Sequence, residues 1–267
     1  GVEIVPVTGR NFSTALPMVE DLLTSGPLIA SNGAIIRSKT GETFLRGLLP
    51  AAVAGEVLRA TPEFRPYTVL TYDLEGQGQF RIEVPNQSRD TERHIEVAQG
   101  AVNVLAPPDG VAASPWIRRY SAAVRFTESL ERALDGDPVE IMFAGPVALM
   151  RAVAERLENG ATGTAMRFRL LRTEYPERDF AIVDVIRQDC SKGHAVEAWS
   201  RFRGIPPDAI LAIGDNYNDL DMLRFAGVPV VMGNSEEALK QQGWPVTLDC
   251  DSGGVARAVE QFVLGNR

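Results

Sequence analysis

The segment LAIGDNYNDLDML, residues 211–223, constrains the fold of this chain more than any other stretch. Its apolar start, together with Ala209 and Ile210 just before it, is typical of a strand buried in a parallel sheet. A turn rich in carboxylates and side-chain amides follows directly. Because ligand sites of open α/β sheets form at the carboxyl ends of the strands, we expect Asp215 to lie where a hard cation such as Mg²⁺ can bind.

The tripeptide GDN at 214–216 favours a simpler interpretation when it is taken alone. Asp and Asn are common in turns and at helix N-caps, so these two residues after a glycine indicate no more than an acidic turn before the next helix. The longer string, placed directly after an apolar run, is much more specific for a ligand site.

Strand-like and helix-like patterns alternate at both ends of the chain, which favours a parallel α/β sheet. There we expect strands at 2–7, 27–30, 209–213 and 228–232, a turn at 31–33, and helices at 12–23, 192–203, 217–226, 235–241 and 253–264. The middle has α+β patterning instead. It predicts a hairpin over 66–84, a loop over 102–116, a strand at 139–144, a helix at 146–157 and antiparallel strands at 166–171 and 180–186.

This change of pattern predicts two domains in the 267 residues. An α/β core is expected from residues 1–48 and 187–267, with an α+β domain inserted at 49–186. A chain of this length with 45% hydrophobic residues can bury two such cores.

The composition argues against several classes of function. A formal net charge of −8 and the lack of any basic run disfavour a general nucleic-acid surface. The apolar stretches are far shorter than the roughly 20 residues that a membrane helix needs. Cys190 and Cys250 form no metal-ligand pattern and fit a reducing compartment, so we expect a cytoplasmic protein, with a disulfide between them as the alternative.

Three predicted strand ends carry residues suited to phosphate chemistry: Thr8-Gly9, Lys192 and the turn from Asp215 to Asp219. A Thr hydroxyl and a Gly backbone N–H donate to phosphoryl oxygens, and a lysine at a helix start supplies positive charge. Taken singly, Thr8-Gly9 could be an ordinary strand-to-helix turn.

Lys192 taken singly could be a solvated residue at a helix start, but it is one of only three lysines in the chain. On the helix after Lys192, we expect Trp199 and Phe202 to pack into the core.

Competing motifs do not fit. GxxxxGK[ST], HExxH and GxSxG are absent from the sequence, which disfavours P-loop nucleotide hydrolases, zinc proteases of that type and α/β-hydrolases. A calcium loop of the EF-hand type starting at Asp215 would need Asp or Asn where Tyr217 stands.

Six segments together resemble the haloacid dehalogenase superfamily, and within it the Cof-like phosphatases of subfamily IIB. The resemblance covers nearly the whole predicted core, and the segments flank an insertion of the size of that family's cap. It implies a Rossmann-like core, a type II α+β cap, Mg²⁺ and hydrolysis of small phosphorylated metabolites. The segments are VPVTGRNF (5–12), PLIASNGAII (27–36), SKGHAVEAW (191–199), GDNYNDLDML (214–223), AGVPVVMGNS (226–235) and DSGGVARAVEQF (251–262).

The resemblance also implies roles for individual residues. Thr8 matches the motif II hydroxyl that contacts the phosphoryl group, with Gly9 donating its backbone N–H. Lys192 matches the motif III lysine. In motif IV, Asp215 corresponds to a Mg²⁺ ligand and Asn218 to a phosphate-contacting amide. Asp219 corresponds to the second acid, which supports the metal shell or the lysine.

One family feature does not occur in the sequence. The family's aspartate nucleophile lies in a DxDGT-type motif, and none is found; Asp249-Cys-Asp251 has the DxD spacing but a different place and no following Gly-Thr. The expectation we favour is that the natural protein carries this motif on an N-terminal segment outside the sequence, because the family's central strand would otherwise be missing. Two alternatives stay open: a non-catalytic binder of phosphorylated metabolites, and a phosphomutase-like phosphoryl transferase.

The substrate class expected from the resemblance is sugar phosphates, with nucleotide or cofactor phosphates also possible. No nucleic-acid or membrane partner is expected, and the protein is expected to be a monomer or a homodimer.

Overall fold

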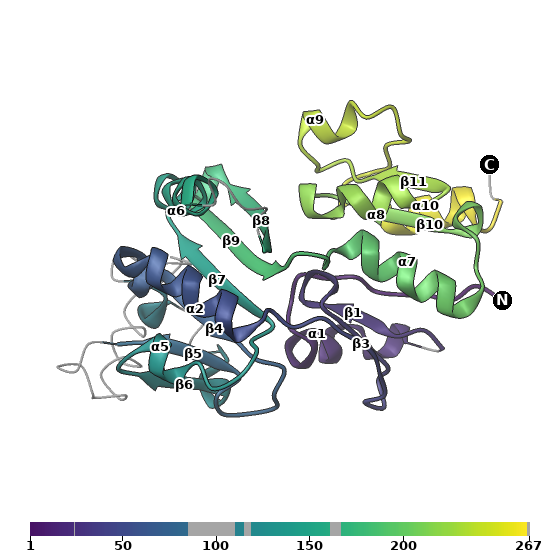
Figure 1. Cartoon of the computed structure of the whole chain (residues 1–267). Helices are drawn as coiled ribbons and strands as arrows, with labels where there is room; N and C mark the ends of the chain where they lie inside the picture. Colours follow the sequence, from purple (N-terminus) through teal and green to yellow (C-terminus); the bar gives the residue numbers. More distant parts are fainter. Residues whose placement is uncertain (24, 85–109, 115–118, 161–166, 266–267) are drawn as a thin grey trace. The chain divides into compact units, whose positions relative to one another are not determined.

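The protein is described here by a computed structural model that covers residues 1–23, 25–84, 110–114, 119–160 and 167–265 (Figure 1). The chain divides into two compact units. Unit 1 comprises Gly1–Arg46 and Cys190–Arg267, and unit 2 comprises Gly47–Asp189. The divisions after Arg46 and Asp189 lie near the divisions after residues 48 and 186 that the sequence pattern predicts.

The first part of unit 1 folds around an antiparallel sheet. The strands β1, β2 and β3 lie side by side in that order. Asn11 caps the α1 helix, its side chain accepting a hydrogen bond from the Ser13 backbone, and the helix is shorter than predicted because residues 20–22 form a 3-10 turn. The elements are α1 (Phe12–Val19), η1 (Glu20–Leu22), β1 (Leu28–Ala30), η2 (Ser31–Gly33), β2 (Ile35–Arg37) and β3 (Thr43–Arg46).

The strand predicted at residues 2–7 is reduced to a single bridge, so that prediction was wrong in extent. Val7 lies parallel to Ile29. The Thr8 backbone N–H donates to the Ile29 carbonyl at 2.9 Å, and Ile29 donates to the Pro6 carbonyl at 3.0 Å. Pro6 has no N–H of its own, which limits the ladder before Val7. The bridge still brings Thr8 to the end of β1.

The second part of unit 1 has the predicted α/β pattern. Strands β10 and β11 pair in parallel, with Leu211 opposite Val228 and Gly214 opposite Val231. Apolar residues of α8 and of both strands form the core beneath them, including Ala212, Leu223 and Val231. The elements are α7 (Lys192–Arg203), η8 (Pro207–Ala209), β10 (Leu211–Gly214), η9 (Tyr217–Asp219), α8 (Leu220–Phe225), β11 (Val228–Val231), α9 (Glu237–Lys240) and α10 (Gly254–Phe262).

The α7 helix packs its Ala195 and Trp199 against Ile29 and Ile36 in a second core cluster. The prediction for Trp199 is confirmed, whereas Phe202 is 67% exposed, so that prediction was wrong. Phe202 stacks instead on Trp199, with ring centroids 5.2 Å apart.

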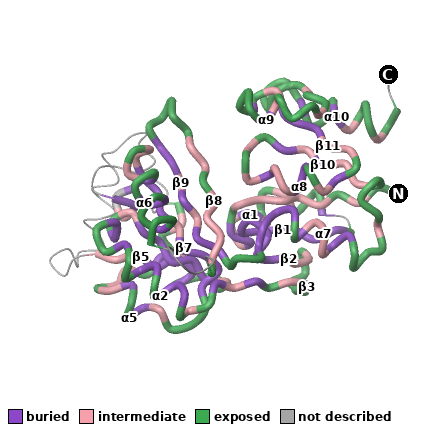
Figure 2. Tube along the Cα trace, turned by 45° about the horizontal axis from the view of Figure 1, so that its top comes forward, coloured by how far each residue is buried: buried purple, intermediate pink, exposed green. Residues whose placement is uncertain are grey.

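Unit 2 is an α+β sandwich around a six-stranded sheet in the order β6-β5-β4-β7-β9-β8. Neighbouring strands are antiparallel except for the parallel pair β5 and β6. Figure 2 shows β7 and β9 largely buried in the sheet and β8 more exposed at its edge. The strands are β4 (Thr68–Thr71), β5 (Phe80–Glu83), β6 (Val124–Thr127), β7 (Glu140–Gly145), β8 (Phe168–Tyr175) and β9 (Phe180–Arg187).

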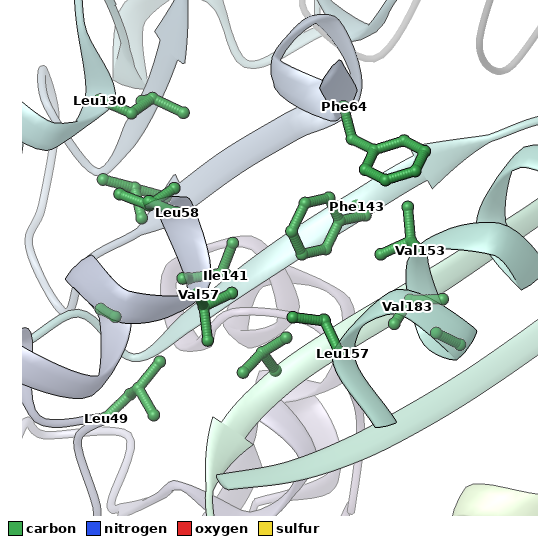
Figure 3. Close-up of a cluster of buried hydrophobic side chains, with 14 of the residues drawn as sticks. Leu49, Val57, Leu58, Phe64, Leu130, Ile141, Phe143, Val153, Leu157 and Val183 are labelled. Atoms are coloured by element: carbon green, nitrogen blue, oxygen red, sulfur yellow. The ribbon is translucent and has the colours of Figure 1, made fainter. Parts of the chain in front are cut away.

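The helices of unit 2 pack apolar side chains against one face of the sheet (Figure 3). Phe143 and Ile141 of β7 lie between apolar side chains of α2 and α6, such as Val57 and Val153. The predicted hairpin at 66–84, the strand near 139–144 and the helix near 146–157 all occur, while most of the predicted loop at 102–116 lies outside the described residues. The helical elements are α2 (Ala51–Ala60), η3 (Pro62–Tyr67), η5 (Val111–Ala113), η6 (Ser121–Ala123), α5 (Leu130–Ala133), α6 (Val147–Gly160) and η7 (Pro176–Arg178).

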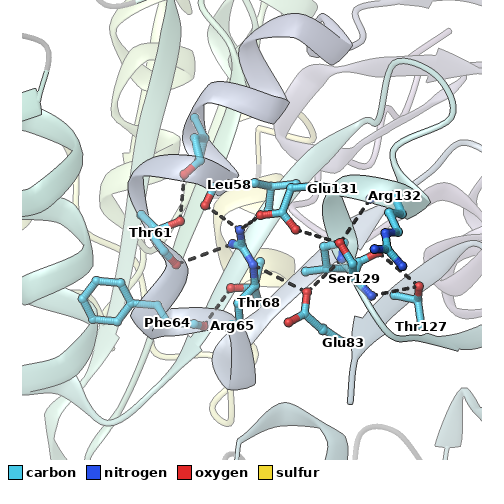
Figure 4. A network of polar contacts seen from close by, with 12 residues as sticks. Leu58, Thr61, Phe64, Arg65, Thr68, Glu83, Thr127, Ser129, Glu131 and Arg132 are labelled. Carbon is cyan, nitrogen blue, oxygen red and sulfur yellow. Dashed lines mark hydrogen bonds and ion pairs between the residues drawn. The ribbon is translucent and has the colours of Figure 1, made fainter. Parts of the chain in front are cut away.

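A buried arginine joins the helical and strand layers of unit 2 (Figure 4). The Arg65 guanidinium donates to the Leu58 carbonyl at 2.6 Å, forms an ion pair with Glu131 and lies 3.6 Å from a Glu83 oxygen. Because these acceptors come from α2, α5 and β5, the charge is paired on several sides and the network is structural.

The two ends of unit 2 lie beside the same strand. The Leu49 backbone N–H donates to the Pro138 carbonyl at 2.8 Å, just before β7. Near the other end of the unit, Ile186 of β9 is opposite Glu140, the first residue of β7. The start of β7 therefore contacts both the segment that begins unit 2 and the segment that ends it.

Candidate active site

The N-terminus of α7 holds Lys192 in place through two caps. The Ser191 side chain accepts a hydrogen bond from the His194 backbone at 3.0 Å. The Gly193 backbone donates to Asp221 Oδ1 at 3.2 Å. A side chain at position 193 would meet the Asp221 backbone carbon at 2.6 Å, so only glycine allows α7 to approach α8 this closely.

Lys192 is the centre of the site. Its Nζ donates to Asp219 Oδ1 at 2.6 Å and to Asn218 Oδ1 at 3.1 Å. Lys192 is 6% exposed and Asp219 is 4% exposed, so two opposite charges are paired away from water. An ammonium in such surroundings is not a solvated helix-start residue, and it retains one more N–H for a ligand.

The turn between β10 and α8 is built around the other oxygen of Asp219. Asp219 Oδ2 accepts hydrogen bonds from the backbones of Asp215 and Asn216, each at 3.0 Å. Gly214 lies so close that a Cβ there would meet the Asp219 Cβ at 2.6 Å. Asp219 therefore closes the turn and holds the lysine with one carboxylate. Its predicted role in the metal shell stays a prediction.

The Thr8-Gly9 turn reaches this cluster through a residue that was not predicted for the site. Arg10 donates its backbone N–H to Thr8 Oγ1 at 3.1 Å, which leaves the hydroxyl hydrogen able to point elsewhere. A Cβ on Gly9 would lie 2.9 Å from Asn32 Oδ1. The same Asn32 oxygen accepts a hydrogen bond from Asn218 Nδ2 at 3.2 Å, so Gly9, Asn32 and Asn218 are neighbours.

Asp215 lies at the outer end of the turn. Asn234 Nδ2 donates to Asp215 Oδ2 at 3.3 Å, and Asn234 is itself fixed by accepting from the Cys250 backbone at 3.0 Å. Partial burial and the nearby Asp219 carboxylate raise the pKa of Asp215, against the lowering effect of Lys192 and Asn234. A bound cation would offset this unfavourable environment of the charged form.

The residues fit Mg²⁺ in a restricted sense. Among the described residues, no group of three or more His, Cys, Asp or Glu side chains could hold a metal by itself. Mg²⁺ usually takes only one or two protein carboxylates and completes its shell with water and substrate phosphate oxygens. Asp215 would supply one such carboxylate, and the neighbouring Asp219 is the second carboxylate of the turn.

Of the residues that the sequence predicted for the site, Lys192, Asn218 and Asp219 are in direct contact, and Gly9 joins them through Asn32. Three further residues were not predicted: Asn32, Asp221 and Asn234. Asn32 and Asn234 both lie in segments that resemble the superfamily, SNG and GNS. Those segments were the only sequence signal for them.

An α/β core that carries a buried lysine, a threonine-glycine turn and an acidic strand end defines a class of phosphoric monoester hydrolases. A family model for haloacid dehalogenase-like hydrolases matches residues 1–105 and 122–259. The chain belongs to the haloacid dehalogenase-like hydrolase family, as its sequence segments predict.

Two relatives of the chain carry phosphatase names. The chain is 36% identical over 81 residues to the 5-amino-6-(5-phospho-D-ribitylamino)uracil phosphatase YitU of Bacillus subtilis, a match that spans 30% of each chain. It is 25% identical over 271 residues to the phosphatase YwpJ of Bacillus subtilis, covering 98% of this chain and 88% of that relative.

A solved sugar phosphatase of subclass IIB of the same superfamily has a similar fold, with a TM-score of 0.68 and 18% identity over 98% of this chain and 86% of that one. This likeness confirms the predicted fold. Among the residues that the structure describes, every helix is too short or too polar to cross a bilayer.

Proposed function

We propose that the protein is a Mg²⁺-dependent phosphatase of small phosphorylated metabolites. The observation that carries the proposal is the buried Lys192, whose Nζ is held by Asp219 and Asn218 at 2.6 and 3.1 Å. A fixed positive charge beside backbone and side-chain donors suits the charge that develops on a phosphoryl group during transfer.

In this proposal each residue has a defined task. The Thr8 hydroxyl and the Gly9 backbone N–H donate to phosphoryl oxygens, the Asn218 amide donates a further hydrogen bond, and Lys192 neutralises charge. Asp215 would hold Mg²⁺, with Asp219 supporting both the turn and the lysine. When bound there, Mg²⁺ would neutralise phosphate charge without a proton transfer.

The attacking group is a separate part of the proposal. Phosphoryl transfer in this family proceeds through an aspartyl-phosphate, and the 267 residues contain no DxDGT motif to supply that aspartate. Asp215 and Asp219 are already assigned to the metal and the lysine. We therefore assign binding and polarisation, but not nucleophilic attack, to the residues of this site.

The proposed substrates are small phosphate monoesters, with sugar phosphates as the first class to test. The name of the relative YitU specifies a phosphorylated ribitylamino compound, in which the phosphate sits on a sugar-derived carbon chain. Unit 2 is proposed as the cap that sets specificity. A cytoplasmic location, a monomeric or dimeric state and the lack of a nucleic-acid partner stay predictions.

The proposal is tested by calorimetry of inorganic phosphate with the 267-residue chain in Mg²⁺, followed by a competition screen of phosphorylated metabolites. We expect phosphate binding that requires both Mg²⁺ and Lys192. The matched control is Lys240→Ala, because Lys240 is a surface lysine paired with Glu237. Binding that survives Lys192→Ala unchanged would refute the proposed site.

A further inference from the structure

We propose that Asn32 is a positioning residue that aims the Asn218 amide at the phosphoryl group. The proposal rests on the proposed function and adds to it a residue to which neither the sequence nor the family resemblance assigned a role. Three observations carry it: the strained backbone of the turn at 31–33, its anchoring to both halves of the site, and the hydrogen bonds of Asn218.

The turn has an unusual backbone. Ser31, Asn32 and Gly33 have φ values of 50°, 53° and 92°, three left-handed residues in succession. Such φ values are uncommon for residues other than glycine, and each costs roughly 1 kcal/mol or more. They persist only where the surroundings fix them.

The surroundings fix this turn from two sides. Ser31 and Asn32 donate their backbone N–H groups to the carbonyls of Arg10 and Thr8, at 2.8 and 3.1 Å. On the other side, a side chain at Gly33 would collide with the carbonyl oxygen of Ser191, the N-cap of α7. The turn therefore lies between the Thr8-Gly9 cradle and the helix that starts with Lys192, and Asn32 is only 1% exposed within it.

The side-chain amide of Asn218 can make both of its hydrogen bonds in only one orientation. A lysine ammonium can only donate, so the Asn218 oxygen must face Lys192 Nζ. The Asn218 nitrogen then faces Asn32 Oδ1, which accepts at 3.2 Å. One Nδ2 hydrogen is used in this bond, and because the amide is planar, the direction of the second hydrogen is also set.

Asn32 supplies more than a backbone conformation. Glycine adopts left-handed φ more easily than asparagine, so a turn selected for its shape alone would not need an amide. The side-chain oxygen of Asn32 provides the acceptor that glycine lacks. Without it, the Asn218 amide could rotate about its bond to Lys192, and its second hydrogen would no longer point in a fixed direction.

The experiment is a double-mutant cycle read by phosphate affinity. Asn32→Gly keeps the backbone conformation and removes the acceptor, and Asn218→Ala removes the amide that it positions. In calorimetry of inorganic phosphate with Mg²⁺, we expect each single change to weaken binding by about tenfold, the effect of one hydrogen bond to a charged ligand. The double variant should be no weaker than Asn218→Ala, since Asn32 acts only through Asn218.

The matched control is Ser31→Gly, which changes the neighbouring left-handed residue but leaves the acceptor of Asn32, and its affinity should equal that of the unchanged chain. The proposal would be overturned if the affinity losses of the two single variants multiply in the double variant. It would also be overturned if Ser31→Gly lowers the phosphate affinity as much as Asn32→Gly does. If Asn32→Gly does not fold, Asn32→Asp replaces it, because it keeps both the acceptor and the left-handed preference. In that background Asn218→Ala should weaken binding by the same factor as in the unchanged chain, and a smaller factor would also overturn the proposal.

A wrong assignment of the function would give a different experimental result from a wrong assignment of Asn32. If the unchanged chain binds no phosphate, the assignment of the site as a phosphate cradle fails, whatever Asn32 does. The contact between Asn32 and Asn218 is then tested by the thermal unfolding midpoints of the unchanged chain, Asn32→Gly, Asn218→Ala and the double variant. Non-additive changes support the Asn32–Asn218 coupling, and additive changes reject it.

Discussion

Lys192 Nζ and Asp219 Oδ1 lie 2.6 Å apart, and each side chain is more than nine-tenths buried. An ion pair removed from water has two consequences that a surface pair does not have. Loss of one partner leaves an unpaired buried charge, and loss of both charges together can be tolerated by the fold. Stability and ligand binding can therefore be separated at this pair.

Lys192→Met is expected to lower the free energy of unfolding by about 3–5 kcal/mol, because it leaves the Asp219 carboxylate buried and unpaired. The double variant with Asp219→Asn should recover much of that loss, since the amide oxygen can still accept from the turn backbone. Phosphate binding should be absent in both. Denaturant unfolding and calorimetry give the two readouts, and phosphate binding by the double variant would contradict the role of the lysine charge.

Asp215→Asn should abolish Mg²⁺ binding, because it removes the charged ligand that a hard cation needs. The matched control is Asp251→Asn, an exposed aspartate of the Asp249-Cys-Asp251 sequence. Calorimetry of Mg²⁺ with both variants makes the comparison. Equal losses in the two variants, or no loss in Asp215→Asn, would contradict the assignment.

Glu140 in unit 2 should make stability depend on pH. It is 5% exposed, and its Oε2 has no hydrogen-bond partner. Burial, followed by the charge of Asp184, raises its pKa well above the usual value, against the effect of the Thr71 hydroxyl. The raised pKa means that the folded state holds the proton, so the stabilisation is present at low pH and is lost as pH rises through the folded pKa.

Glu140→Gln keeps the shape of the side chain without the ionisation. We expect its urea midpoint to exceed that of the unchanged chain at high pH, with the difference shrinking as the pH falls. The measurement is a series of urea midpoints across pH for both proteins. A constant difference at all pH values would show that ionisation of Glu140 is not involved.

The 267-residue chain is expected to bind phosphate but not to hydrolyse an aryl phosphate, because no carboxylate of the site is assigned to attack. The assay compares the chain with its Lys192→Ala variant, and both should match the blank. Turnover that disappears in Lys192→Ala would place the nucleophile within these residues. Asp249→Asn and Asp251→Asn would then be the first variants to examine.

The sequence predicted some of the contacts among the candidate site residues and missed others. The acidic turn after an apolar strand located Asp215, Asn218 and Asp219, because the strand pattern and the turn residues lie next to each other in the chain. Lys192 was ambiguous by residue type alone, since its burial depends on Asp219, which lies 27 positions away. Only the folded chain shows that the two charges meet.

Asn32 and Asn234 were missed for a related reason. Each is an ordinary turn asparagine in the sequence, and each becomes specific only through partners distant in the chain, Asn218 and Asp215. The strand predicted at 2–7 and the burial predicted for Phe202 were wrong because residue type does not show where a ladder or a packed face ends.

The start of β7, which touches both ends of unit 2, has a consequence for the history of the molecule. An insert whose two ends lie together can be gained, lost or exchanged by its host with little change to the host's backbone. Unit 2 also has apolar clusters of its own. Replacement of the whole of Gly47–Asp189 by recombination would therefore leave Lys192 and its neighbours as they are.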